Sequence, residues 1–129
     1  MKIVLDTNVI VSALLIPLSI PGEILFKVFE RKLILVYDNR ILLEYIDVLN
    51  REKFKLDKAL VNLIIDFIKK EGAFFPSMTI NTSFTDKNDK KFYEVFKSAE
   101  AQFLITGNLK HFPKEKGIVS PKEFISLFG

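Results

Sequence analysis

The 129-residue sequence contains no cysteine and a single histidine, His111. Without cysteine, neither a disulfide framework nor a thiolate zinc site can form, and a single imidazole excludes any metal site that needs two. Long apolar runs are also missing, because the longest, 9–16, is broken by Ser12 and is too short to cross a bilayer. No basic leader with a cleavage site precedes the first apolar segment, so we expect a cytoplasmic protein without a membrane anchor.

Hydrophobic residues and lysines are abundant. With 49% hydrophobic residues, thirteen of them Phe, the chain is expected to bury a core and to form one domain over residues 1–129. The net charge is +3, and the lysines gather at 53–58, 87–97 and 110–116. Such clusters suit a polyanionic ligand such as nucleic acid, and they are equally typical of solvated surface.

Short apolar strand segments alternate with helical segments along the chain. The predicted strands are 2–6, 33–37, 73–75, 103–106 and 118–119. A helical region directly after the first strand is followed by predicted helices at 22–32, 39–50, 56–72, 88–100 and 121–127, with an irregular connection at 76–85. This alternation predicts an α/β fold with three α/β/α layers around a parallel sheet of four or five strands.

The first predicted strand ends on an acidic residue, Asp6, which Thr7 and Asn8 follow. In open α/β sheets, ligands bind just beyond the carboxyl ends of the strands, so Asp6 is expected at the mouth of such a crevice. From this segment alone, Asp6 is either a cap for the following helix or an acidic member of a reaction site.

Two further carboxylates are expected near the same edge of the predicted sheet, with Asp89 at the edge and Glu44 about one helical turn inside it. Glu44 borders the apolar face of its helix, where such a residue is often simply paired or extended toward solvent. Asp89 lies in the first turn of its helix, where Asp86, Asn88 and Asp89 can complement the positive helix terminus. Because parallel strands and the following helices bring strand ends and helix N-termini to one edge, Asp6, Glu44 and Asp89 are expected to converge there.

Converging carboxylates repel each other unless a cation lies between them. Hard oxygen ligands, with no cysteine and no second histidine, suit Mg²⁺ or Mn²⁺. Such ions activate water and stabilise the charge that develops on a phosphodiester. The three carboxylates therefore indicate metal-assisted phosphodiester chemistry.

The ordered motifs resemble those of the PIN-domain ribonucleases, and of the branch described as toxin components of toxin–antitoxin systems. The motifs are Asp6-Thr7-Asn8, Glu44 within ILLEYIDVL, Asp86-x-x-Asp89-x-x-Phe92, and LITGN at 104–108. The resemblance implies that residues 1–129 form one PIN-like domain, and that the protein is a metal-dependent endoribonuclease of single-stranded RNA. It also implies a homodimer and, in a toxin system, an antitoxin protein as partner.

The resemblance also implies roles for individual residues. Asp6, Glu44 and Asp89 would hold Mg²⁺ or Mn²⁺, with Asn108 and Asp86 as weaker ligand candidates and with support from Thr7, Asn8 and Thr106. Asn108 departs from the family pattern, which usually has Asp at this position, and the missing charge is expected to lower the affinity for a second metal. Lys90 and Lys91 directly follow Asp89, and we expect them to contact RNA.

Other interpretations of the same residues are weaker. A haloacid-dehalogenase-type phosphatase needs a second Asp where Asn8 stands, and a receiver domain needs an N-terminal acidic pair that is lacking; Asp38, which follows the second strand, is expected to cap a helix. His111 has no partner placed for it and is expected to cap or decorate a loop. The serious alternative is a PIN-like module that binds RNA or protein without nuclease activity.

Overall fold

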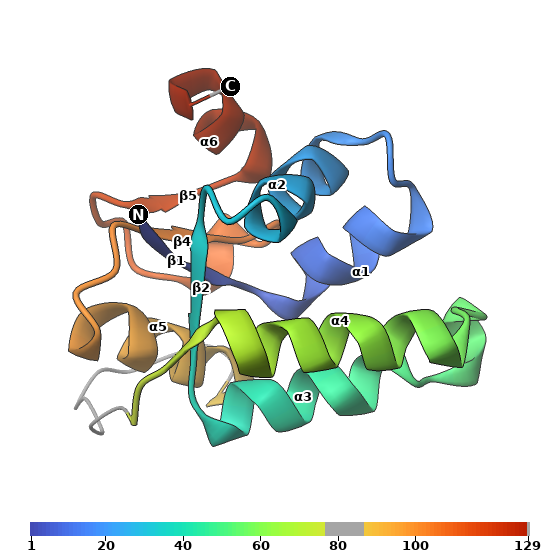
Figure 1. Ribbon diagram of the computed structural model, residues 1–129. Helices are drawn as coiled ribbons and strands as arrows, with labels where there is room; N and C mark the ends of the chain where they lie inside the picture. Colours follow the sequence, from blue (N-terminus) through green and yellow to red (C-terminus); the bar gives the residue numbers. More distant parts are fainter. Residues whose placement is uncertain (77–86, 129) are drawn as a thin grey trace.

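The structure is a computed structural model that describes residues 1–76 and 87–128. In chain order (Figure 1), the elements are β1 (Lys2–Leu5), α1 (Thr7–Leu15), α2 (Ile20–Phe29), β2 (Ile34–Tyr37), α3 (Asn39–Leu49), η1 (Glu52–Phe54), α4 (Lys58–Glu71), β3 (Ala73–Phe74), α5 (Lys87–Ser98), β4 (Phe103–Ile105), η2 (Leu109–His111), β5 (Ile118–Val119) and α6 (Pro121–Phe128). The predicted connection at 76–85 lies outside the described residues apart from Pro76.

The strands form one parallel sheet of five in the order β3-β2-β1-β4-β5. Helices α3, α4 and α5 cover one side of this sheet, and α2, α6 and the adjoining α1 lie on the other (Figure 1). The predicted three-layer α/β/α fold is therefore confirmed. The chain builds outward from β1 to β3 and then returns to place β4 on the opposite side of β1. A ligand crevice is expected at this point of reversal, between the carboxyl ends of β1 and β4.

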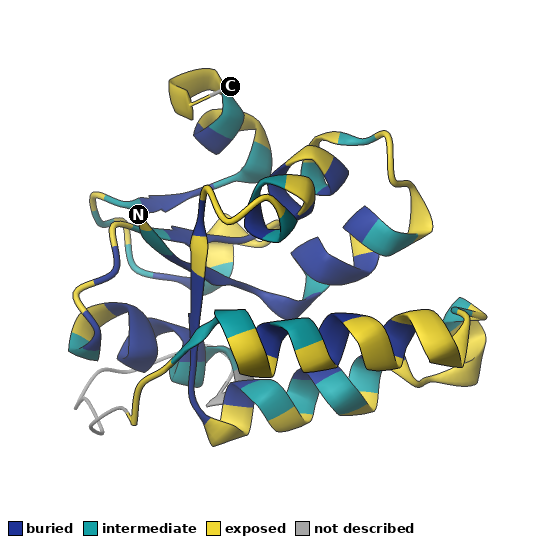
Figure 2. Ribbon diagram, in the orientation of Figure 1, coloured by how far each residue is buried: buried dark blue, intermediate teal, exposed yellow. Residues whose placement is uncertain are grey.

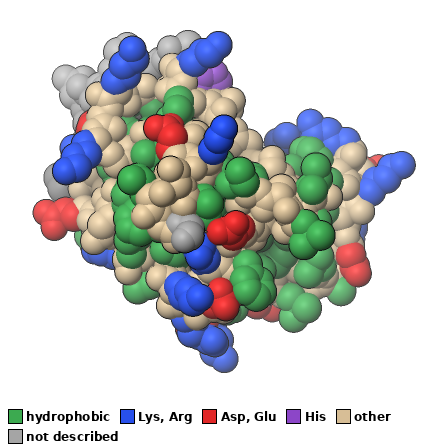
Figure 3. All heavy atoms as spheres, turned by 90° about the horizontal axis from the view of Figure 1, so that it is seen from above, with side chains coloured by type: hydrophobic (Ala, Val, Ile, Leu, Met, Phe, Trp, Pro, Cys, Tyr) green, Lys and Arg blue, Asp and Glu red, His purple; other side chains and the backbone are tan. Residues whose placement is uncertain are grey.

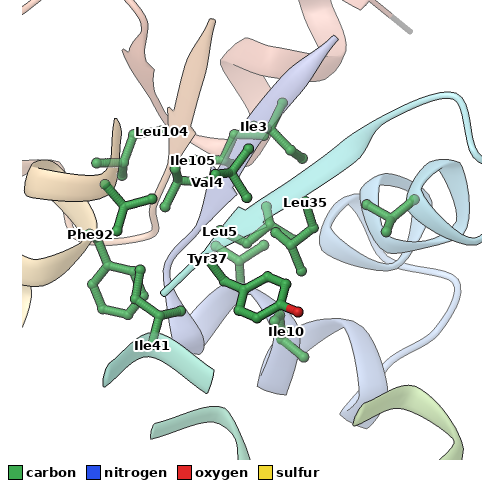
Figure 4. Close-up of a cluster of buried hydrophobic side chains, with 14 of the residues drawn as sticks. Ile3, Val4, Leu5, Ile10, Leu35, Tyr37, Ile41, Phe92, Leu104 and Ile105 are labelled. Carbon is green, nitrogen blue, oxygen red and sulfur yellow. The ribbon is translucent and has the colours of Figure 1, made fainter. Parts of the chain in front are cut away.

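The core lies on both faces of β1, β2 and β4. Buried residues form bands along these strands and along the inward sides of the helices (Figure 2). Ile3, Val4 and Leu5 are 0% exposed, and Figure 4 shows the apolar side chains of β1, β2, β4, α3 and α5 packed together. Strands buried on both faces have continuous apolar sequences, which is why β1 was recognisable in the sequence.

Helix α2 differs from its predicted range of 22–32. It begins two residues earlier because the Ser19 side chain accepts a hydrogen bond from the backbone N–H of Gly22, and because Pro21 in the first turn has no N–H to leave unpaired. It ends at Phe29, and Arg31 then takes a positive φ of 63°. No single described helix is long and apolar enough to span a membrane. Taken together, α1 and α2 have the length and the apolar composition of a span, but the two helices are bent by 101° relative to each other.

Candidate metal centre

Asp6 follows β1 directly and lies beside the end of β4, where its backbone N–H donates a hydrogen bond of 3.0 Å to the carbonyl oxygen of Ile105. Its side chain is buried, at 5% exposure, and its Oδ2 accepts a hydrogen bond of 2.7 Å from the Thr106 hydroxyl, which follows β4. The same hydroxyl oxygen accepts a hydrogen bond from the backbone N–H of Asn108 at 2.9 Å. Asp6 occupies the N-cap position of α1 but makes no capping side-chain hydrogen bond. The cap interpretation thus does not account for this carboxylate.

The pKa of Asp6 reports which charges lie near it. Burial, as the largest cause, together with the negative charges of Asp89 and Glu44, raises this pKa to about 6 against the lowering effect of the Thr106 hydrogen bond. The three carboxylates that the sequence brings to one edge are therefore close enough to repel one another. A cation among them would favour the ionised form of Asp6.

Glu44 lies in the second turn of α3 and faces the start of α1 and α5. One carboxylate oxygen, Oε2, accepts a short hydrogen bond from the Thr7 hydroxyl. The other, Oε1, lies 2.6 Å from the Lys91 ammonium. The Lys91 side chain is only 12% exposed. Lys91, expected to contact RNA, is thus paired with a carboxylate of the cluster.

Asp89, in the first turn of α5, is paired with the only histidine of the chain. Its Oδ2 lies 2.9 Å from Nδ1 of His111, at the end of η2. The expectation that His111 merely caps or decorates a loop was wrong. The partners are separated by 22 residues, and only the return of the chain through β4 brings η2 beside α5.

A buried hydrogen bond of Tyr45 fixes the position of α3 relative to β1. The Tyr45 hydroxyl donates a hydrogen bond of 2.5 Å to the carbonyl oxygen of Leu5, directly before Asp6. Burial first, and then the charges of Asp6, Glu44 and Asp38, hold the pKa of Tyr45 well above its ordinary value. The hydrogen bond from Tyr45 anchors α3, which carries Glu44, to the end of β1.

A second ionic contact joins α3 to α5, and sequence reasoning missed it. Arg40 lies 2.7 Å from Asp38 and 2.7 Å from Glu94, whose side chain is 3% exposed. Asp38 also accepts a hydrogen bond from the backbone N–H of Ile41, which confirms its predicted role as the cap of α3. At 100° per residue Glu94 lies on the side of α5 opposite Phe92 and Phe96, so helical periodicity gave no signal of its burial. A buried carboxylate needs a partner, and the packing of α3 against α5 supplies Arg40.

The remaining candidate residues lie at the edge of the carboxylate cluster or outside the described residues. Asn108 is exposed, and Asn8 accepts a long hydrogen bond of 3.4 Å from the backbone N–H of Gly107. Lys90 is partly buried beside Asp89, whereas Asp86 lies outside the described residues. On the face drawn in Figure 3, lysine and arginine side chains stand as separate groups between hydrophobic and uncharged ones.

The donor set fits a hard divalent cation by its chemistry. Three carboxylates with hydroxyl and amide oxygens beside them are the ligand types that Mg²⁺ and Mn²⁺ prefer. Among the described residues, however, no three acidic or histidine side chains stand in a ligating arrangement. The reason is visible in the contacts, because Glu44 is turned to Lys91 and Thr7, and Asp89 to His111.

Comparison with known proteins gives a consistent picture. Residues 2–110 match the PIN domain family, and this span includes every candidate site residue named above apart from His111. An uncharacterized protein of Methanocaldococcus jannaschii is 31% identical over 142 residues, which cover 98% of this chain and 91% of that relative. No solved structure matches the chain.

Proposed function

Because the chain belongs to the PIN-domain family, whose members are generally nucleases, we propose that it is a divalent-metal-dependent endoribonuclease that cleaves single-stranded RNA. The observation that carries this proposal is the convergence of Asp6, Glu44 and Asp89 at the point where the strand order reverses. The buried Asp6 carboxylate beside two further carboxylates is costly to the fold, and a function that recruits a cation explains this arrangement.

Asp6, Glu44 and Asp89 are the proposed ligands of Mg²⁺ or Mn²⁺, with Asn108 at the edge of the site. The bound ion would supply positive charge to the phosphodiester and activate water. Thr106 fixes the Asp6 carboxylate by its 2.7 Å hydrogen bond. Thr7 orients Glu44, and Asn8 holds the turn at Gly107. Lys90, beside the cluster on α5, is the proposed contact to the RNA backbone.

The proposed partners follow from the resemblance and from one apolar surface. A groove of about 600 Å³ lies between the α1–α2 connection and α4, where Leu18, Phe26 and Leu60 are exposed. Contiguous exposed apolar surface is typical of a protein interface. We propose that residues 1–129 act as one domain in a cytoplasmic homodimer, as the toxin of a pair whose antitoxin is a second protein.

Cleavage of single-stranded RNA across a Mn²⁺ and Mg²⁺ titration tests the proposed activity. We expect wild type to cleave, and Asp6→Asn and Asp89→Asn to lose cleavage by at least about a hundredfold, because each removes a full charge from the cluster. Asp66→Asn is the matched control, since Asp66 is exposed on α4, which carries none of the three carboxylates.

Two outcomes would change the assignment. If Asp6→Asn cleaves as fast as wild type, these carboxylates are not the reaction site. If wild type binds labelled RNA in a gel-shift experiment but cuts none at any metal concentration, a non-catalytic RNA-binding module is the better interpretation. The pairing of Glu44 with Lys91, and the amide at Asn108, are the observations that favour this second candidate.

A further inference from the structure

Lys91 differs from the other lysines that form ion pairs in the described part of the chain. Its side chain is 12% exposed, whereas those of Lys32 and Lys97 are 63% and 46% exposed in their pairs. The Lys91 ammonium lies 2.6 Å from Glu44 Oε1 and 5.1 Å from the centre of the Phe92 ring. An ammonium withdrawn from water is held by its partners, which here include a carboxylate and an aromatic face.

The contacts of Glu44 leave neither carboxylate oxygen without a partner. Thr7 donates to Oε2, and Lys91 contacts Oε1. The Thr7 hydroxyl is neutral and does not repel a cation bound to the same carboxylate, whereas the ammonium carries a full positive charge. Lys91 is therefore the main competitor of a divalent cation for binding to Glu44.

We propose that the Lys91 ammonium is a resident cation of the carboxylate cluster, which competes with the divalent ion for Glu44 and thereby sets the metal affinity of the site. This inference rests on the proposed function, because it concerns the same site and the same ion. Metal loading then requires Lys91 to leave Glu44, and the protein holds its acidic cluster partly neutralised until the ion arrives. Part of the cost of gathering three carboxylates is thereby offset within the chain itself.

Titration calorimetry with Mn²⁺ alone, on the intact chain, tests this competition. Lys91→Met removes the charge and keeps an unbranched stem against Phe92. We expect this variant to bind Mn²⁺ at least about tenfold more tightly than wild type, because a double and a single positive charge within about 6 Å repel by that much even at the dielectric constant of water. Lys91→Arg keeps the charge and should stay near the wild-type affinity.

The matched control is Lys90→Met, which removes a neighbouring lysine charge from the same turn of α5. Its Mn²⁺ affinity should change by less than about threefold, since no ion pair between Lys90 and Glu44 is among the described contacts. If Lys91→Met does not fold, Lys91→Gln serves instead, because a neutral amide can still donate to Glu44. Melting in EDTA of Lys91→Met, Glu44→Gln and the double variant checks the ion pair independently, and the two effects should be non-additive.

The outcomes separate this inference from the proposed function. Equal, measurable Mn²⁺ affinity in wild type and Lys91→Met overturns the competition and leaves the nuclease assignment intact. Weaker binding in Lys91→Met also overturns it, because Lys91 would then assist the metal. No Mn²⁺ binding in wild type or in any Lys91 variant overturns both. Binding by Lys91→Met where wild type binds none supports the competition and shows that wild type is not loaded.

Discussion

Replacing Asp6 by asparagine should stabilise the metal-free protein, although Asp6 is the proposed centre of the site. Burial and two neighbouring carboxylates raise the pKa of Asp6 from 3.8 to about 6. The folded state therefore binds a proton more tightly than the unfolded state, and the stability of the wild type falls as the pH rises from about 4 to about 6. At 1.36 kcal/mol per pKa unit, the full loss is about 3 kcal/mol above pH 6.

The side-chain amide of the Asp6→Asn variant would carry no charge at any pH and would escape this loss. In EDTA at pH 7.5, we expect the variant to be more stable than wild type by about 1–3 kcal/mol, where the upper figure assumes no relaxation around the carboxylate. For a chain of this length, this corresponds to a rise in melting temperature of about 4–11 °C. The difference should shrink to a small fraction at pH 4, because wild-type Asp6 is then protonated when folded.

Thermal melting followed by circular dichroism at pH 7.5 and pH 4 measures this effect. Asp66→Asn, at an exposed position, should show no such pH-dependent difference. Saturating Mn²⁺ should stabilise wild type more than Asp6→Asn, since an ion that binds only the folded state adds RT ln(1 + [Mn²⁺]/Kd). A lower melting temperature for Asp6→Asn in EDTA at pH 7.5 would refute the reasoning, because the fold would then stabilise the ionised carboxylate.

Three other measurements test the proposed site and its partners. Asn108→Asp should cleave RNA faster and at a lower Mn²⁺ midpoint than wild type, because it restores a negative charge at the rim of the site; unchanged rate and midpoint would place residue 108 outside it. Lys90→Ala should make the slope of log affinity for single-stranded RNA against log salt shallower by about 0.7, the value for one phosphate contact. An unchanged slope would show that Lys90 is a solvated surface residue that does not contact the RNA. Light scattering at micromolar concentration should give twice the monomer mass of 14.9 kDa, and a monomer mass alone would contradict the homodimer.

Local patterns predicted the elements well because their causes are local. The apolar run of β1 is buried on both faces, so it contains no polar interruption between Ile3 and Asp6. Asp38 was predictable as a helix cap because it accepts a hydrogen bond from a backbone N–H only three residues away, that of Ile41. The family, the parallel α/β fold and the placement of Asp6 at a strand end follow from such short-range features and their order.

The tertiary structure decided what faces the carboxylates. The order β3-β2-β1-β4-β5 places Thr106 against Asp6, although 100 residues separate them. Its position directly after Asp89 predicted that Lys91 contacts RNA, but the packing of α5 against α3 turned its ammonium to Glu44. The return of the chain through β4 brought His111 to Asp89. A sequence pattern specifies which residues share a face of one element. Only the packing of elements distant in the chain determines which charge lies opposite.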